Sequence, residues 1–185
     1  MGFTVIYDAN VLYPNTTRDV LVRVAQAGLV QAKWTKRILT EMTDALRRNR
    51  PNITKEKATR LESLMCEAVR DCLVEGYESL EGALVLPDPD DRHVLAAAIR
   101  CGAQVIVTNN VADFPADQLS QFGIEAKTAD AFILDQIYLA RDSLVSIVAQ
   151  IAASRKKPPQ DVNDVLDSLQ KDGQLLSAAA LRVIH

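Results

Sequence analysis

The sequence is organised around the stretch Leu86-Pro87-Asp88-Pro89-Asp90-Asp91-Arg92-His93-Val94-Leu95-Ala96-Ala97-Ala98-Ile99. It places three aspartates within four positions, and an apolar run follows directly. Because proline fixes its own φ and disfavours the helical region for the preceding residue, Pro89 predicts a turn at Asp88 and a helix close behind it. Asp90 or Asp91 then falls at the N-cap or first turn, where the helix dipole favours negative charge. A cap needs only one aspartate, so three mutually repelling carboxylates indicate that something cationic lies opposite them.

Composition predicts one soluble globular domain with a small extension. The chain has 185 residues, of which 48% are hydrophobic and 24% charged, with a formal net charge of −3. Any contact with nucleic acid must therefore come from a local basic face. Three cysteines without a CxxC spacing are typical of reduced thiols in a cytoplasmic protein. We expect neither a signal peptide nor a membrane-spanning segment.

Short apolar runs rich in β-forming residues predict buried parallel strands. They lie at residues 3–7, 83–86, 104–108 and 124–126. The first three runs each end in polar residues: Asp8, then 88–91, then Asn110 with Asp113. Because the carboxyl ends of parallel strands share one edge of the sheet, we expect these side chains to converge on one carboxylate site.

Apolar residues at helical spacing predict the helices. The predicted ranges are 17–27, 36–48 with Thr35 as N-cap, a helix capped by Thr54, 91–100, one long helix over 130–154 capped by Asp130, and two short helices between 160 and 184. Glu41 falls beside the apolar stripe of its helix, so it is either a solvated flank residue or a site ligand.

The long helix predicted over 130–154 carries apolar residues on more than one face, whereas a surface helix of a monomer needs only one stripe. The surplus requires cover from the final segment, from a second subunit or from a partner protein. We therefore expect a domain over 1–154 and a helical extension over 155–185 that folds back on it. We also expect a homodimer formed through this helical side.

Three arginines, Arg47, Arg48 and Arg50, end the helix that carries Glu41. They complement the helix dipole, or they form a phosphate-contacting face beside the acidic site and bind RNA. His93 is interpreted as a helix-surface residue, because its neighbour Asp91 has to face the site.

Four segments in this order resemble the PIN domain, the metal-dependent nuclease fold of VapC-type toxins. They are 6–12, the helix around Glu41, 88–98 and 107–114. The resemblance covers roughly residues 3–135 and implies a three-layer α/β/α sandwich around a central parallel sheet. It also implies that Asp8, Glu41, Asp91 and Asp113 bind the metal and carry the catalysis. Asp90 is expected to support this metal site or to serve as an alternate ligand.

The activity that this resemblance implies is metal-dependent hydrolysis of RNA phosphodiester bonds, by the toxin of a toxin–antitoxin pair with a cognate antitoxin. Hard carboxylate oxygens without histidine or thiolate suit Mg²⁺ or Mn²⁺. Some relatives carry an acid where this chain has Asn110, so here the fourth ligand is Asp113 alone.

Two alternatives stay open at this stage. A phosphatase of the haloacid dehalogenase type has Asp-x-Asp after its first strand, but here Asn10 replaces the second acid and removes the general acid. A non-catalytic PIN-like module that binds RNA or a protein would share the fold without the chemistry. The acid missing at Asn110 keeps this second alternative open.

Overall fold

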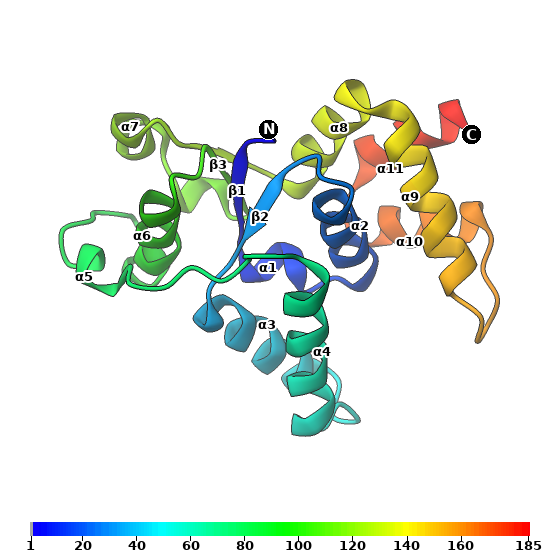
Figure 1. Ribbon diagram of the computed structural model, residues 1–185, viewed down its shortest axis with the longest axis horizontal. Helices are drawn as coiled ribbons and strands as arrows, with labels where there is room; N and C mark the ends of the chain where they lie inside the picture. The colour runs from blue at the N-terminus through cyan, green and yellow to red at the C-terminus, as the bar shows by residue number, and fades with distance from the viewer. Residues whose placement is uncertain (1) are drawn as a thin grey trace.

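The computed structural model describes residues 2–185, and within them a four-stranded parallel sheet forms the centre of the molecule (Figure 1). The strands have the order β2-β1-β3-β4. In this register Val5 lies opposite Ala32 on one side and opposite Val105 on the other. Their bounds are Thr4–Tyr7 for β1, Gln31–Lys33 for β2, Val105–Val107 for β3 and Glu125–Lys127 for β4. The predicted α/β class with a parallel sheet is confirmed.

Helices connect the strands and extend the chain beyond the sheet. Their bounds are α1 Ala9–Leu12, α2 Asn15–Gln26, α3 Lys36–Asn49, α4 Lys55–Ala68, α5 Glu78–Glu81, α6 Arg92–Cys101, α7 Ala116–Leu119, α8 Ala129–Leu139, α9 Arg141–Ser154, α10 Val162–Lys171 and α11 Leu175–Ile184. Single 3₁₀ turns lie at Pro89–Asp91, Val111–Asp113 and Ser120–Phe122. Among residues 2–185, none of the helices combines the length and apolar character that crossing a lipid bilayer requires.

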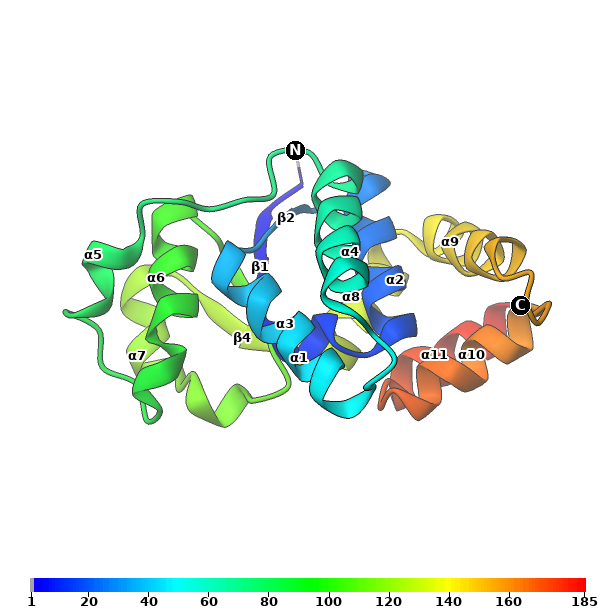
Figure 2. The same cartoon turned by 90° about the horizontal axis from the view of Figure 1, so that it is seen from below.

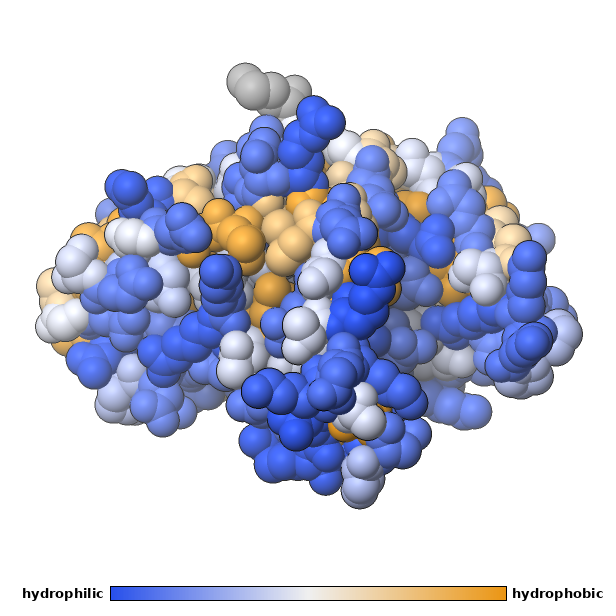
Figure 3. Space-filling view, turned by 60° about the horizontal axis from the view of Figure 1, so that its bottom comes forward, coloured by the Kyte–Doolittle hydropathy of each residue, from blue (hydrophilic) through white to orange (hydrophobic). Residues whose placement is uncertain are grey.

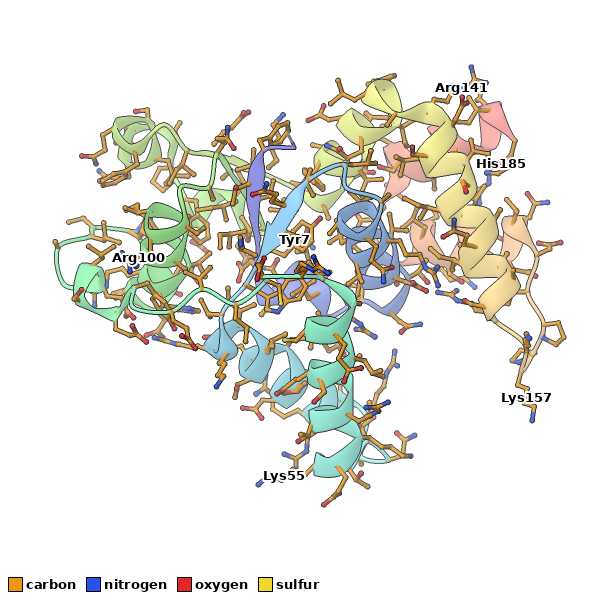
Figure 4. The ribbon with its side chains drawn as sticks, in the orientation of Figure 1. Tyr7, Lys55, Arg100, Arg141, Lys157 and His185 are labelled. Atoms are coloured by element: carbon orange, nitrogen blue, oxygen red, sulfur yellow. The ribbon has the colours of Figure 1, made fainter. Side chains whose placement is uncertain are left out.

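Helices cover the sheet on both faces, which makes the predicted three-layer sandwich. Helix α6 packs against β1 and β3, whereas α2 and α8 lie on the other side of the strands (Figure 1). On that second side Tyr7 is fully buried (Figure 4), and its hydroxyl donates to the Leu21 carbonyl at 3.1 Å. Its ring packs against Trp34 and Phe132, with centroids 6.3 and 5.9 Å away. The core of this layer is therefore built around the residue that precedes Asp8.

The strand predicted over 83–86 is wrong. Leu84 and Leu86 are buried and Val85 is 70% exposed, which reproduces the alternation of a strand. The segment nevertheless pairs with no strand in the part of the chain that the structure describes. A strand needs a neighbouring backbone as well as alternating burial. The fourth strand is instead β2, which was not predicted from the sequence.

The single helix predicted over 130–154 is also wrong, because the chain breaks at Ala140. There φ is −147° and ψ is 57°, so α8 ends and α9 begins. The N-cap of α8 is Thr128, whose hydroxyl accepts from the Ala131 N–H at 3.1 Å, rather than Asp130. Helix α8 packs on α11, while α9 packs on α2 and α10. The apolar residues that were predicted on several faces of one helix therefore belong to two helices, and each helix packs on different neighbours.

The segment after Pro159 folds back as helices, as predicted (Figure 2). Two carboxylates join it to the rest of the chain at helix N-termini. Asp172 accepts from the Thr17 N–H at 2.9 Å and from the Thr17 hydroxyl at 3.1 Å, near the start of α2. Asp130 accepts from the N–H groups of Leu176 and Ser177 at 2.9 and 2.8 Å, at the start of α11. The domain boundary at residue 154 stays a prediction.

Candidate functional site

Asp8 follows β1 directly, at the carboxyl edge of the sheet, and is 6% exposed. One carboxylate oxygen accepts from the Ala9 N–H at 2.7 Å. The other accepts from the Thr108 hydroxyl at 2.8 Å and from the Asn10 amide at 3.1 Å. Burial raises the pKa of Asp8, and the hydrogen bonds from Thr108 and Ala9 oppose that rise. Three donors therefore fix the direction of a buried acid.

The loop after β3 is tied to the loop after β1. The side-chain oxygen Oδ1 of Asn10 accepts from the Asn109 N–H at 2.9 Å, and the Thr108 hydroxyl accepts from the Asn110 N–H at 3.1 Å. These bonds hold the start of the loop that leads to the 3₁₀ turn ending at Asp113, which is half-buried. The structure thus joins the two predicted strand ends through Asn10 and Thr108, neither of which was among the predicted ligands.

Asp91 lies half-buried where the 3₁₀ turn passes into α6. The pKa of Asp91 is raised to about 6, mainly by burial and then, in decreasing order, by the charges of Asp8, Asp88 and Asp113. Three of the four predicted ligands therefore lie close enough for their charges to interact. Aspartates far apart in the sequence have come together at one edge of the sheet.

The two neighbouring acids, Asp88 and Asp90, are exposed. Asp88 has the extended backbone predicted before Pro89, and its carboxylate accepts from the Asp90 N–H at 2.9 Å. Asp91 occupies the N-cap position of α6 without a side-chain hydrogen bond. The role of Asp90 as a metal ligand stays a prediction.

Glu41 reaches the site from α3, and its carboxylate raises the pKa of Asp8. The same oxygen of Glu41 lies 3.0 Å from His93 Nε2 and 3.3 Å from Arg37 Nε. His93 is 1% exposed, so the prediction of a surface histidine is wrong. The prediction assumed that Asp91 and His93 lie on one helix and point in different directions. Asp91 is instead the N-cap that precedes α6, so helical spacing does not fix the direction of its side chain relative to that of His93.

The carboxylates of the acidic site suit a hard divalent cation, although their arrangement is not that of a complete metal site. Within residues 2–185, no group of three or more His, Cys, Asp or Glu side chains is arranged to hold a metal ion as it stands. The acids nevertheless raise one another's pKa, which is the repulsion that a cation relieves. Carboxylate oxygens are also the donors that Mg²⁺ and Mn²⁺ prefer. The residues therefore fit such an ion by their chemistry.

Asp91→Asn is expected to stabilise the protein in chelator at pH 7.5 by about 1 kcal/mol, after discounting for the solvent exposure of this group. The folded pKa of about 6 lies above the ordinary 3.8, so ionisation of Asp91 costs stability as the pH rises through 6. Near pH 4 the carboxyl is largely neutral and the gain should shrink towards zero. Urea unfolding at both pH values measures this gain, with Asp142→Asn at an exposed position of α9 as the control. An equal gain at both pH values would show that charge is not its cause.

Residues 4–112, more than half of the 185, match the family model described as the PIN domain. The chain belongs to the PIN domain family. The matched range contains Asp8, Glu41 and Asp91 and ends one residue before Asp113. Family membership confirms the predicted resemblance and removes the basis for a haloacid dehalogenase-type phosphatase. Residues 129–183, which span α8 to α11, match the model described as the VapC50 C-terminal domain.

This PIN domain is also similar to a protein of Mycobacterium tuberculosis (strain ATCC 25618 / H37Rv) with the name "Putative ribonuclease VapC50". The two are 38% identical over 93 residues, which is 50% of this chain and 55% of that protein. The match thus spans about half the length of that relative. No solved structure gives a significant match to the chain.

Proposed function

We propose that this PIN domain is a metal-dependent endoribonuclease that acts as the toxin of a toxin–antitoxin pair. One observation carries the proposal: Asp8 is buried and held by three donors, and its charge acts on Asp91 beside Asp113. Glu41 completes the acidic set from α3. The name of the Mycobacterium relative supports the same activity. The metal ligands would be Asp8, Glu41, Asp91 and Asp113, with exposed Asp90 as a further donor.

The side chains around these acids orient them. When bound, Mg²⁺ or Mn²⁺ supplies activation of water and neutralises charge on the phosphate. Thr108 and Asn10 fix the carboxylate of Asp8, and His93 fixes that of Glu41. Partners of this kind typically contribute 10–100-fold to metal affinity or activity. His93 is engaged through Nε2 and buried, so its contribution is positioning rather than proton transfer to solvent.

A cleavage assay tests this function. The purified chain should cut single-stranded RNA in Mg²⁺ or Mn²⁺ and should leave it intact in chelator. Asp142→Asn, on the exposed start of α9, should cut like the wild type. Cleavage that persists in chelator would contradict metal dependence. RNA binding without cleavage in any of these metals would favour the non-catalytic module instead.

Arg47, Arg48 and Arg50 are proposed to contact RNA phosphates. All three are exposed at the projecting end of the α3–α4 pair, where hydrophilic side chains gather (Figure 3). Replacing them by alanine should weaken single-stranded RNA binding and lower the salt slope by about 2, since each phosphate contact contributes about 0.7. Fluorescence anisotropy across salt concentrations measures both. Exposed Lys156 and Lys157, changed together to alanine, provide the control, and Figure 4 labels Lys157. An unchanged slope would return the arginines to the helix-dipole role.

Two protein contacts belong to the same proposal. A ribonuclease toxin needs a cognate antitoxin, which is expected to restrain this chain as well. Self-association through the helical side is supported by large apolar side chains that are more than half exposed there. They are Tyr138, Leu139, Leu175, Leu176 and Val183. Light scattering of the full chain measures the mass of the particle.

A further inference from the structure

A pocket of about 300 Å³ opens directly beside the acidic site, between α1 and α3. These two helices lie side by side (Figure 2). Its walls include Ala9 and Asn10, which follow Asp8 in the chain, and Glu41 from the acidic set. The pocket therefore continues the site rather than forming a separate cavity.

The lining of this pocket is apolar on its floor and polar at one end. Met42 is fully buried and Ala45 half-buried, and half-buried Tyr13 contributes from the other wall. Exposed Asn49 lies at the end of α3, and its amide donates to the Tyr13 hydroxyl at 3.1 Å. That bond uses one amide hydrogen, so the Asn49 carbonyl oxygen and second amide hydrogen stay available to a ligand.

The spacing along α3 explains why room exists at this position. Glu41, Ala45 and Asn49 follow one another at intervals of four residues and so lie on one face of the helix. The middle residue is an alanine, and a larger side chain there would fill the pocket. Along this face of α3, the carboxylate of Glu41 is followed by the open space over Ala45 and then by the side-chain amide of Asn49. Exposed Arg48 lies next to the amide.

We propose that this pocket seats the base of the nucleotide adjoining the scissile phosphate, with Asn49 hydrogen-bonding its edge; this inference rests on the proposed ribonuclease function. A nucleobase has apolar faces and a polar edge, which matches the floor and the end of the pocket. Proteins that read single-stranded RNA pack bases on aromatic side chains and hydrogen-bond their edges. The basic end of α3 also favours a polyanion over a neutral peptide at this position. Ala45 sets the size of the subsite and Asn49 sets its base preference.

The test compares RNA with and without bases. Ala45→Leu should lower affinity for single-stranded RNA 12-mers by roughly tenfold in chelator, the loss expected for one stacked base. Its affinity for a 12-mer of the same backbone with abasic nucleotides should not change. Asn49→Ala should reduce differences in affinity among the four homopolymer 12-mers. Thr40→Leu adds the same side chain on an exposed position of α3 and should bind like the wild type.

The outcomes separate this inference from the proposed function. If the wild type cuts RNA but Ala45→Leu and Asn49→Ala keep wild-type affinity and base preference, the subsite is overturned and the pocket is left to a partner protein's side chain. If the wild type neither binds nor cuts RNA, the proposed function fails first. Equal losses for normal and abasic RNA in Ala45→Leu would also overturn the subsite. Exposed Asn49 keeps the test valid if Ala45→Leu fails to fold.

Discussion

Replacing Asp8 by asparagine is expected to lower RNA cleavage by at least about 100-fold, because loss of a residue that only supports a ligand already costs 10–100-fold. Both oxygens of Asp8 accept hydrogen bonds, from Ala9 on one side and from Thr108 and Asn10 on the other. An asparagine amide must point its N–H₂ group at one of these donors, so it cannot reproduce the arrangement. The variant also removes a negative charge from the set that includes Asp91.

Stability distinguishes loss of chemistry from loss of fold in this variant. The unfavourable donor contact costs about 1–3 kcal/mol, and removal of a buried charge offsets part of that cost. Thermal unfolding in chelator should therefore show a folded protein. Thr108→Val keeps the carboxylate but removes one donor, so it should lose activity by about tenfold only. Equal cleavage by the wild type and Asp8→Asn would remove Asp8 from the catalytic set.

Much of the fold could be predicted because its signals are local. Thr35 and Thr54 cap α3 and α4 as expected, and Gly173 ends α10 with a positive φ of 100°. Strand pairing is not local, and this is why 83–86 was predicted as a strand and β2 was missed. Residues 84–86 have the burial pattern of a strand without a partner, whereas β2 has three residues and a partly exposed sequence. The break at Ala140 likewise lacks a proline or glycine to mark it.

Part of the candidate site could be predicted, because acids that directly follow short apolar runs can be recognised in the sequence. The charges of Asp8 and Asp113 act on Asp91, and Asp91 lies in a 3₁₀ turn rather than at the end of a strand. The metal-binding role of these residues stays a prediction. The supporting side chains were missed. Thr108 and His93 act through contacts that join positions 100 and 52 residues apart, and no local pattern marks such pairs. The apolar run after His93 was the one available sign that it lies inside.

Deletion of residues 156–185 is expected to abolish cooperative unfolding or to cause aggregation. The segment buries Val165, Leu166, Leu169, Ala178 and Leu181 completely. These side chains pack in helices against α8 and α9, so their loss exposes a large apolar face. The deletion also removes Asp172, which binds the start of α2. Helix α2 has no side-chain cap of its own, so the tail completes a helix of the domain.

Point variants resolve this effect in a chain that still folds. Leu166→Ala should cost about 2–5 kcal/mol through the cavity that it leaves, and Asp172→Ala about 1–2 kcal/mol through the lost cap. Val183→Ala, at a position 85% exposed, should stay within about 0.5 kcal/mol and serves as the control. Urea unfolding gives these free energies, and light scattering reports any change of oligomeric state.

The deletion has an outcome that would contradict this expectation. If the truncated chain stays soluble, with the oligomeric state and melting temperature of the full chain, the tail is dispensable. The buried leucines and the Asp172 bonds lead us to expect the opposite, because α2 packs on the same face of the sheet as Tyr7 and so connects the tail to the strand that places Asp8.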